Sequence, residues 1–291
     1  MRNQQFKGTA VAVVTPFNDD GSVDYTSLEK LIETLIEGGL DYLVALGTTA
    51  ETPTLSKEEK TKIIETFIRV TDARVPILVG AGGNNTSDVI QWINELDKYP
   101  VQGYLCVAPY YNKPSQAAMK VHFESIAQST KRSIVLYNVP GRTASNIEAA
   151  TCLHLANSFE NIVAIKEASG SLPQIMDIIA GAPDGFYVLS GDDALTLSMI
   201  SVGAQGVVSV IGQAYPKRYS QMVSAAMSGD FELARKMHYN LLDITNAIYV
   251  EGNPTGIKCL LSEMDLCENE LRLPLIKASN ALAADIKGKM L

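Results

Sequence analysis

The 291-residue sequence has few cysteines, few histidines and no excess of basic residues, and each scarcity excludes a class of protein. Its four cysteines include no CxxC pair and are too sparse for a disulfide framework, so we expect reduced, mostly buried thiols. Its three histidines show no HxxxH spacing, so we expect no zinc site and no other metal centre. The net charge of −8 makes nucleic acid and anionic membranes poor partners.

Long apolar segments are also absent. No apolar run approaches the roughly 20 residues of a membrane helix, and the opening stretch MRNQQFKGTAVAVVTPF lacks the pattern of a signal peptide. We therefore expect a cytoplasmic protein with no membrane partner. The content of 46% hydrophobic and 19% charged residues is that of a globular chain that buries a large core.

Short β-branched apolar runs alternate with segments of helical apolar spacing, which indicates a parallel sheet with crossover helices. Eight strands are predicted, at residues 10–15, 42–47, 76–82, 103–109, 133–139, 162–168, 186–191 and 206–211. This alternation implies an α/β fold of the (β/α)8 TIM-barrel type. A doubly wound open sheet is the alternative, but the first strand is followed by TPFNDDGSVD and not by the GxGxxG of dinucleotide-binding folds.

The last part of the chain contains no further strand pattern. Helical spacing predicts helices at residues 217–228, 231–249, 255–264 and 270–287. Because a barrel needs only about 250 residues, this part is expected to be an appendix to it. We therefore divide the chain into a catalytic barrel of residues 1–224 and a C-terminal helical extension of residues 225–291.

In a TIM barrel the reactive side chains lie at the C-terminal ends of the strands. Lys166 ends the apolar run of the sixth strand, where a desolvated amine can be neutral and attack a carbonyl carbon. The alternative is a structural lysine paired with Glu167 or Asp193. Tyr137 ends the preceding strand, so we expect it beside Lys166, either as a general acid or as a packed aromatic.

Arg142 follows Tyr137 on the next predicted loop. Its guanidinium is suited to binding a carboxylate at two points, and a surface cation is the alternative. Thr48 and Thr49 follow Gly47 in a predicted tight turn. This turn either cradles a small carboxylate or uses a threonine side chain to cap a short helical turn.

Two further motifs are interpreted as structural. Asp192 and Asp193 stand before an apolar segment, which is typical of helix capping and first-turn charge. The segment GAGGNNTSD lacks both the GKS/T of a phosphate loop and a full GxGxxG, so it predicts a turn with a helix cap near Thr86 or Ser87.

Taken together, seven motifs in their order and spacing resemble the dihydrodipicolinate synthase family, of the superfamily that includes N-acetylneuraminate lyase. They are GTTAETPTL at 47–55, APYYNKPSQ at 108–116, YNVPGRT at 137–143, IKEASG at 165–170, LSGDD at 189–193, GVVSV at 206–210 and EGNPTGIK at 251–258. The resemblance extends over essentially the full chain. It implies a lyase that condenses pyruvate with L-aspartate 4-semialdehyde to 4-hydroxy-tetrahydrodipicolinate, in lysine and diaminopimelate biosynthesis.

The resemblance also implies roles for individual residues, with Lys166 as the Schiff-base lysine. The catalytic residues that it implies are Lys166, Tyr137, Thr49 and Tyr111. The last of these would reach in from a neighbouring subunit of a homotetramer built from two tight dimers. The substrate-binding residues that it implies are Thr48, Thr49, Arg142, Gly191 and Val208, with Arg142 on the carboxylate of the semialdehyde. Because the lysine imine is itself the electron sink, the implied chemistry needs no organic cofactor and no metal.

Regulation by lysine is common in the family, at a site on the tight dimer interface. The matching positions here are Asn84, Asp88 and Tyr110. Regulated bacterial relatives often have His where this chain has Lys57 and Lys60. Permanent cations near a site for a cationic ligand oppose its binding, so we expect lysine inhibition to be weak or absent.

One departure and two alternative functions accompany the resemblance. Ala50 replaces the usual Gly of GTTGE, which would strain the turn if that position needs a positive φ. A sialate or 2-keto-3-deoxy-sugar-acid lyase would share Lys166 and Tyr137, but Arg142 and the sequence GTT in place of GST argue against it. A non-catalytic barrel that binds a keto acid is the alternative from a different class.

Overall fold

The computed structural model describes residues 5–291 of the chain. Eight strands, neighbours in chain order, form a closed parallel barrel, which confirms the predicted (β/α)8 fold. The strands are β1 (Gly8–Ala12), β2 (Tyr42–Ala45), β3 (Ile77–Gly80), β4 (Gly103–Val107), β5 (Ser133–Asn138), β6 (Ile162–Glu167), β7 (Tyr187–Ser190) and β8 (Gly206–Ser209). The alternative of a doubly wound open sheet is therefore wrong, because a closed barrel has no open edge.

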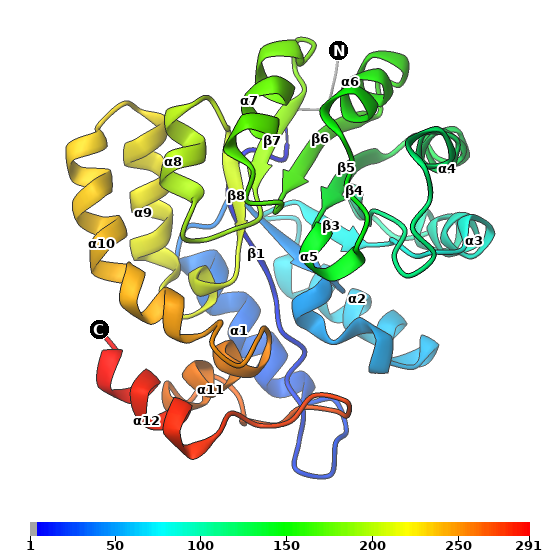
Figure 1. The fold of residues 1–291 in the computed structure, drawn as a ribbon. Helices are drawn as coiled ribbons and strands as arrows, with labels where there is room; N and C mark the ends of the chain where they lie inside the picture. Colours follow the sequence, from blue (N-terminus) through cyan, green and yellow to red (C-terminus); the bar gives the residue numbers. More distant parts are fainter. Residues whose placement is uncertain (1–4) are drawn as a thin grey trace. The chain divides into compact units, whose positions relative to one another are not determined.

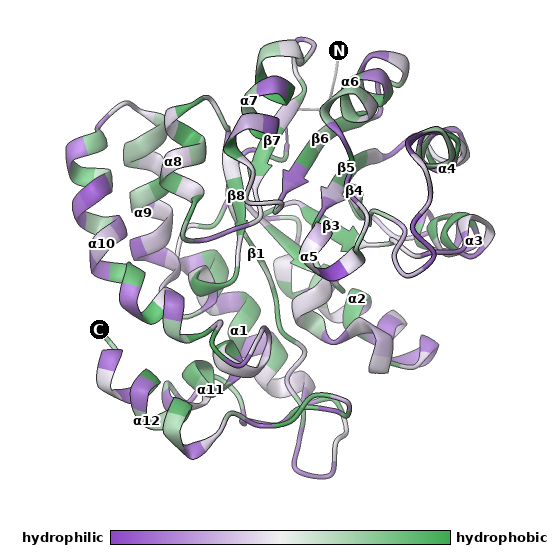
Figure 2. Ribbon diagram, in the orientation of Figure 1, coloured by the Kyte–Doolittle hydropathy of each residue, from purple (hydrophilic) through white to green (hydrophobic). Residues whose placement is uncertain are grey.

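The strands are buried on both faces, as parallel strands covered by helices must be. Every residue of β5 and β6 is buried, including the polar residues Asn138, Lys166 and Glu167 at their C-terminal ends. Figure 2 shows these strand ends in purple against the green of the apolar runs. Buried polar side chains at the C-terminal ends of barrel strands are typical of a reaction site.

The chain forms two compact units. The first contains the described residues up to Gly8 together with Pro76–Val208, and the second contains Thr9–Val75 and Ser209–Leu291. The division predicted at residue 224 stays a prediction, and that residue lies within a helix of the second unit.

In the first unit, helices cross over between consecutive strands from β3 to β8 (Figure 1). They are α3 (Thr86–Leu96), α4 (Gln116–Ser129), α5 (Pro140–Thr143), α6 (Ala149–Ser158), α7 (Leu172–Gly181) and α8 (Thr196–Ser201). The side chain of Asn85 caps α3 by accepting a hydrogen bond from the Ser87 N–H, so the cap predicted at Thr86 or Ser87 lies one residue earlier. The carboxylate of Asp192 accepts from the N–H groups of Ala194 and Leu195 and closes the turn before α8. The interpretation of Asp192 and Asp193 as helix cap and first-turn charge is wrong, because α8 begins at Thr196 with no side-chain cap and no acidic residue in its first turn.

The second unit contains β1, β2 and the helices at the two ends of the chain. These helices are α1 (Tyr25–Glu37), α2 (Lys57–Thr71), α9 (Pro216–Met227), α10 (Phe231–Ala247), α11 (Thr255–Glu263) and α12 (Asn280–Lys289). Short 3₁₀ turns lie at Thr48–Ala50, Thr52–Thr54 and Ile211–Gln213. Ser56 and Glu59 form a capping box that starts α2.

Several predicted strands run one to three residues past the observed ones, and one predicted helix is much shorter than expected. The helix predicted at 270–287 is α12 alone, and residues 270–279 contain no helix. Pro274 lies in this stretch, and a proline both lacks the N–H that a helix needs and disfavours helical geometry in the residue before it. The first strand was predicted at 10–15 but ends at Ala12, and beyond it the Val14 N–H donates to the Gln213 side chain instead of a neighbouring strand.

Candidate active site

The ends of β5 and β6 bring two of the predicted catalytic side chains together. Tyr137 and Lys166 are register partners on these neighbouring strands. The Lys166 Nζ atom lies 4.4 Å from the centre of the Tyr137 ring, and the exposed fractions are 5% for Lys166 and 6% for Tyr137. The prediction that Tyr137 lies beside Lys166 is confirmed. A buried amine beside a phenol is suited to attack on a carbonyl with proton transfer.

The ion pairs described for residues 5–291 include none between Lys166 and Glu167, whose carboxylate accepts hydrogen bonds from other groups. The alternative of a structural lysine paired with Glu167 is therefore not supported, and its pairing with Asp193 stays a prediction. A lysine held in a salt bridge would keep its proton and be a poor nucleophile. The amine of Lys166 is instead placed against an aromatic face.

The carboxylate of Glu167 belongs to a separate buried network. It accepts hydrogen bonds from the side-chain amides of Asn138 at 2.6 Å and Gln174 at 2.7 Å, and from the Ser169 N–H at 2.9 Å. Asn146 completes the network, since its amide donates to Gln174 and its oxygen accepts from Asn138, both at 2.8 Å. This network fixes the ends of β5 and β6 next to the reactive pair. The sequence motif IKEASG contained Glu167, but its amide partners were not predicted.

Gly191 provides the space for the Lys166 side chain. Its N–H donates to the Glu167 carbonyl at 2.7 Å, at the end of β7. A Cβ at Gly191 would lie 2.9 Å from Lys166 Cε and 2.8 Å from the Ala168 Cβ. The structure thus places Gly191 against the stem of the lysine, while its predicted contact with substrate stays a prediction. Val208 is buried in β8, where the resemblance placed the pyruvate site.

Arg142 lies in the last turn of α5, the short helix that follows β5. The helix begins with Pro140 and is closed by Ala144 in the left-handed region, with φ 54°. Its short length holds Arg142 within five residues of the end of the strand that carries Tyr137. The side chain is exposed, as a group that binds an incoming charged substrate must be before binding. Its role in binding a carboxylate stays a prediction.

The loop after β4 carries the predicted relay residue Tyr111 on its surface. Tyr111 is 87% exposed, and its φ of 76° is rare for an aromatic residue. A strained backbone that exposes a large ring is typical of a functional loop. The predicted regulatory residues lie nearby in this unit, with the Asn84 side-chain amide 3.4 Å from the Tyr110 carbonyl oxygen. Asp88 stands in the first turn of α3.

In the second unit, the 3₁₀ turn Thr48–Ala50 follows β2. Gly47 precedes the turn and no threonine side chain caps it, so the capping alternative for Thr48 and Thr49 is wrong. The hydroxyl of Thr15 donates to the Ala50 carbonyl at 2.8 Å and fixes the turn. Ala50 is not among the residues with positive φ, whereas the next residue, Glu51, takes the left-handed conformation with φ 52°. The replacement of the usual Gly by Ala50 therefore does not strain the backbone of this turn.

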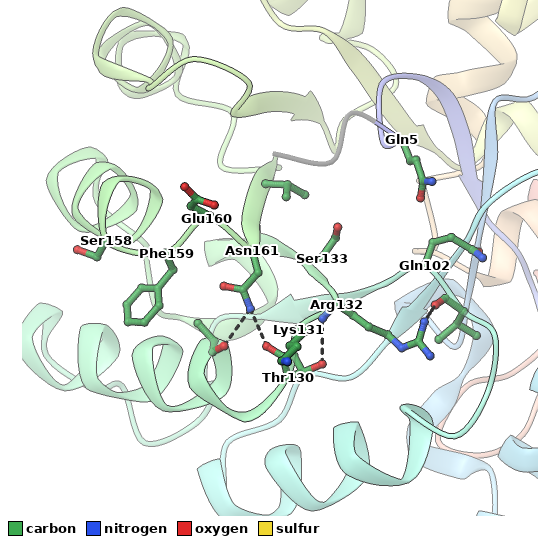
Figure 3. A pocket seen from close by; sticks show the side chains of 13 residues that line it. Gln5, Gln102, Thr130, Lys131, Arg132, Ser133, Ser158, Phe159, Glu160 and Asn161 are labelled. Atoms are coloured by element: carbon green, nitrogen blue, oxygen red, sulfur yellow. Dashed lines mark hydrogen bonds between the residues drawn. The ribbon is translucent and has the colours of Figure 1, made fainter. Parts of the chain in front are cut away.

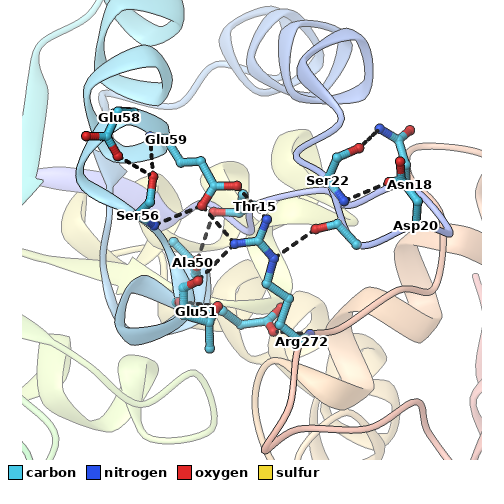
Figure 4. Close-up of polar contacts among 12 residues, drawn as sticks. Thr15, Asn18, Asp20, Ser22, Ala50, Glu51, Ser56, Glu58, Glu59 and Arg272 are labelled. Atoms are coloured by element: carbon cyan, nitrogen blue, oxygen red, sulfur yellow. Dashed lines mark hydrogen bonds and ion pairs between the residues drawn. The ribbon is translucent and has the colours of Figure 1, made fainter.

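A buried ion pair ties this turn to the C-terminal segment. The Glu51 carboxylate lies 2.5 Å from Lys258 Nζ, with both side chains fully buried, and it accepts a hydrogen bond from the Arg272 N–H at 3.0 Å. Figure 4 shows the Arg272 guanidinium against Glu59, where two hydrogen bonds of 2.8 and 2.5 Å form. Burial lowers the pKa of the Lys258 ammonium, and the Glu51 charge opposes that shift. Glu51 lies in the motif GTTAETPTL and Lys258 in EGNPTGIK, but no local spacing predicts that they pair.

One cavity in the first unit lies at the opposite ends of the strands. Its volume is about 710 Å³, and its lining includes Gln102, Arg132 and Asn161, which precede β4, β5 and β6 (Figure 3). The Arg132 guanidinium is already occupied, since it pairs with Asp97 and donates to backbone carbonyls. Residues at the N-terminal ends of barrel strands serve stability rather than catalysis. We therefore do not place the reaction in this cavity.

Residues 5–291 contain no group of three or more His, Cys, Asp or Glu side chains placed to hold a metal ion. No helix in the same range is long and apolar enough to cross a bilayer.

Comparisons with known proteins agree with the geometry. Residues 5–289 match the family described as "Dihydrodipicolinate synthetase family". The 4-hydroxy-tetrahydrodipicolinate synthase of Azobacteroides pseudotrichonymphae is 49% identical, over 100% of this chain and 98% of that protein. The chloride-inhibited dihydrodipicolinate synthase of Acinetobacter baumannii, solved with pyruvate, matches with a TM-score of 0.95 and 37% identity over 97% of each chain. The Cyanidioschyzon merolae enzyme, solved with lysine bound, matches with a TM-score of 0.96 and 34% identity over 99% and 98% of the two chains.

Proposed function

The chain belongs to the dihydrodipicolinate synthetase family and condenses pyruvate with L-aspartate 4-semialdehyde, and we propose that the amine of Lys166 is its nucleophile. The observation that carries this assignment is the buried Lys166 amine over the ring of Tyr137. An amine in this setting can attack a ketone carbon and form an imine.

The reaction proceeds through an imine and then an enamine of pyruvate. Lys166 Nζ adds to C2 of pyruvate, and water leaves as the imine forms. The imine withdraws electrons from the methyl group, which loses a proton to give an enamine. The enamine carbon attacks the aldehyde of the semialdehyde. The amino group of that substrate then displaces Lys166 from C2, which closes the ring and frees the lysine. The electron sink throughout is the lysine imine, so these steps use no metal and no organic cofactor.

We assign the proton transfers to Tyr137, with Thr49 and Tyr111 as further members of a relay. The position of Tyr137 supports this role, since its ring packs against the nucleophile. Thr48, Thr49, Gly191 and Val208 are proposed to surround pyruvate. Their backbone and hydroxyl groups suit a small carboxylate, and the buried Thr49 hydroxyl stands in the turn after β2.

Arg142 is proposed to bind the carboxylate of the semialdehyde. Its place five residues after Tyr137, exposed at the end of the short helix α5, supports this role. A guanidinium can bind a carboxylate with two parallel hydrogen bonds, which a lysine amine cannot do. The presence of Arg142 also favours the proposed activity over that of a sialate lyase.

We further propose that Tyr111 acts in the site of a neighbouring subunit of a homotetramer. Its exposed ring and its strained backbone support this, because a partner subunit would cover the ring and offset the strain. Mixing Lys166→Ala with Tyr111→Phe is expected to restore part of the activity in hybrid sites. No recovery after demonstrated subunit exchange would assign Tyr111 to its own subunit's site or to none.

Weak inhibition by lysine also stays part of the proposal. The residues proposed to hold lysine are Asn84, Asp88 and Tyr110, and the cations Lys57 and Lys60 are proposed to oppose it. Initial rates over a lysine titration test this, and full inhibition at the concentrations that inhibit regulated relatives would contradict it.

Product formation tests the proposed chemistry directly. Purified protein is given pyruvate with L-aspartate 4-semialdehyde, and the cyclic product is detected through its NADPH-dependent reduction by a coupling reductase. A parallel reaction contains pyruvate with N-acetylmannosamine. We expect NADPH consumption only with the semialdehyde. Sialate formation would favour the lyase alternative, and no turnover of either aldehyde would favour a binding protein.

A further inference from the structure

The strands β5 and β6 pair in a register that changes along their length. Ile134 of β5 pairs with Ile162 of β6. The next residue of β5, Val135, pairs with Ala164, so the register shifts by one residue between the two pairs. Beyond this shift, the register depends on how the strands are held at their C-terminal ends. A slip of one residue there would turn Lys166 to the other face of the sheet, because successive side chains of a strand point to opposite faces.

A buried polar pair lies at these ends, directly after the reactive residues. Asn138 and Glu167 are register partners, one position beyond Tyr137 and Lys166. Both polar side chains are fully buried, and the Asn138 amide donates to the Glu167 carboxylate at 2.6 Å. Because strand side chains alternate, this pair lies on the face of the sheet opposite to that of Tyr137 and Lys166. It can therefore act on the reactive pair only through the backbone of the two strands.

The hydrogen bonds of the polar pair fit the observed register. The Asn138 side-chain oxygen accepts from the Ile147 N–H at 2.8 Å, so its amide nitrogen is the end that faces Glu167. The Ala168 N–H donates to the Asn138 carbonyl at 2.8 Å and continues the same pairing by one residue. In another register the buried carboxylate would lose its donor from β5, and loss of a partner by a buried charge is strongly destabilising. A single buried polar contact fixes the register of coiled coils on the same principle.

We propose that Asn138 and Glu167 are positioning residues that hold β5 and β6 in the register where Tyr137 lies opposite Lys166. This inference rests on the proposed function, in which Lys166 is the nucleophile and Tyr137 transfers protons. It gives the buried carboxylate next to the nucleophile a part in the reaction without any contact with substrate. Displacement of a reacting group by about 1 Å can cost on the order of 100-fold in rate, so even a partial shift of the reactive pair is measurable.

The test exchanges the donor and the acceptor between the two strands. Glu167→Gln sets a second side-chain amide against the Asn138 amide, which removes the charged acceptor of the cross-strand hydrogen bond. The double variant Asn138→Asp with Glu167→Gln places the acceptor on β5 and the donor on β6. One cross-strand hydrogen bond can then form again with opposite polarity, and the pair keeps its single negative charge.

Imine formation is the reaction that is measured. Labelled pyruvate trapped to completion with borohydride counts the competent sites, and the trapping rate is expressed per such site. At saturating pyruvate we expect Glu167→Gln to lower this rate about tenfold or more. The double variant should recover to within about threefold of the wild type, because the two substitutions compensate each other. The pyruvate concentration that gives half the maximal rate should change less than about twofold, since the pair touches no substrate.

A second measurement follows proton transfer. The exchange of pyruvate methyl protons with deuterium from solvent requires both the imine of Lys166 and a group that moves the proton. Its rate per competent site should fall in Glu167→Gln and recover in the double variant, in the same order as the trapping rate.

Gln174→Leu is the matched control. It removes another donor to the same carboxylate, at 2.7 Å, but this donor comes from α7 and not from the neighbouring strand. The variant should lower the urea midpoint of unfolding, because the buried charge loses a hydrogen bond. It should leave the trapping rate per competent site within about twofold of the wild type, because the register of β5 and β6 is kept.

Three results would overturn the proposal. The first is a trapping rate of Glu167→Gln within about twofold of the wild type. The second is a double variant that traps pyruvate no faster than Glu167→Gln, including the case in which neither forms an imine. The third is an equal loss of rate in Gln174→Leu, which would show that the network only solvates the Glu167 charge. Failure of the proposed function would look different, because the unaltered protein would then form no imine with pyruvate.

Discussion

Substitution of Gly191 by alanine tests how tightly the structure fixes the nucleophile. The added Cβ would lie 2.9 Å from Lys166 Cε, 3.1 Å from Lys166 Cγ and 2.8 Å from the Ala168 Cβ. Carbon atoms in contact are normally about 3.5–4.0 Å apart, so the lysine stem must shift by roughly 0.5–1 Å. Its Nζ atom moves with the stem.

Displacement of a reacting group by about 1 Å can cost on the order of 100-fold in rate. We therefore expect Gly191→Ala to slow imine formation with pyruvate by about 10- to 100-fold. Overpacking of this kind also costs about 1–3 kcal/mol in the free energy of unfolding. That is a fraction of the stability of a normal domain, so the variant should stay folded at 25 °C.

The assay is the rate at which borohydride traps the pyruvate imine, followed by mass spectrometry, with the urea midpoint of unfolding measured on the same sample. Gly288→Ala is the control, because a Cβ at that position meets no atom within 4 Å. It should trap pyruvate at the wild-type rate. A Gly191→Ala variant that traps pyruvate as fast as this control would refute the reasoning.

Three further predictions concern stability, pH and substrate binding. Lys258→Met leaves the fully buried Glu51 carboxylate unpaired, so urea denaturation should show the free energy of unfolding lowered by about 3–5 kcal/mol, and a change below about 1 kcal/mol would contradict this. Burial lowers the pKa of His122 from its usual value to about 4. As the pH falls below about 6.5, the His122 imidazole therefore takes up a proton in the unfolded chain before it does so in the folded one, and the free energy of unfolding drops by at most about 3 kcal/mol toward pH 4. Urea midpoints at pH 7 and pH 4 should therefore differ less in His122→Phe than in the wild type, and an equal difference would be evidence against it. Arg142→Ala should leave imine trapping unchanged and raise KM for the semialdehyde tenfold or more, because roughly 1.5–3 kcal/mol of charged hydrogen bonding is lost. Unchanged turnover at low semialdehyde concentration would show that Arg142 does not bind the carboxylate of this substrate.

The parts of the fold that could be predicted are those encoded by local pattern. Eight apolar runs of strand length gave the barrel, and the ends of two of them gave Tyr137 and Lys166, because parallel neighbours bring their C-terminal ends together. The apolar faces of α1 and α2 followed from helical spacing in the same way. Each of these inferences depended only on residues within about one element of each other.

The features that sequence analysis missed depend on contacts across long separations. Glu51 and Lys258 are 207 positions apart, and Thr49 and Asn253 are 204 apart, so no local spacing relates them. Each residue alone looks like an ordinary polar position. Their burial is the informative fact, because a buried charge or amide requires a partner, and burial is decided by the tertiary fold.

The end of the chain illustrates the opposite error. The apolar spacing at 270–287 predicted one helix, but only Asn280–Lys289 is helical. The stretch before it uses the Arg272 backbone and guanidinium to bind Glu51 and Glu59. These tertiary contacts and Pro274 outweigh the weak helical pattern.

The central claim is that Lys166 forms a covalent imine with pyruvate. Protein incubated with pyruvate and borohydride, then digested and mapped by mass spectrometry, should carry a single reduced pyruvyl adduct on the Lys166 peptide, because borohydride traps only the imine. Lys166→Ala should carry none under the same conditions. An adduct on another lysine, or one that persists in Lys166→Ala, would contradict the assignment of the nucleophile.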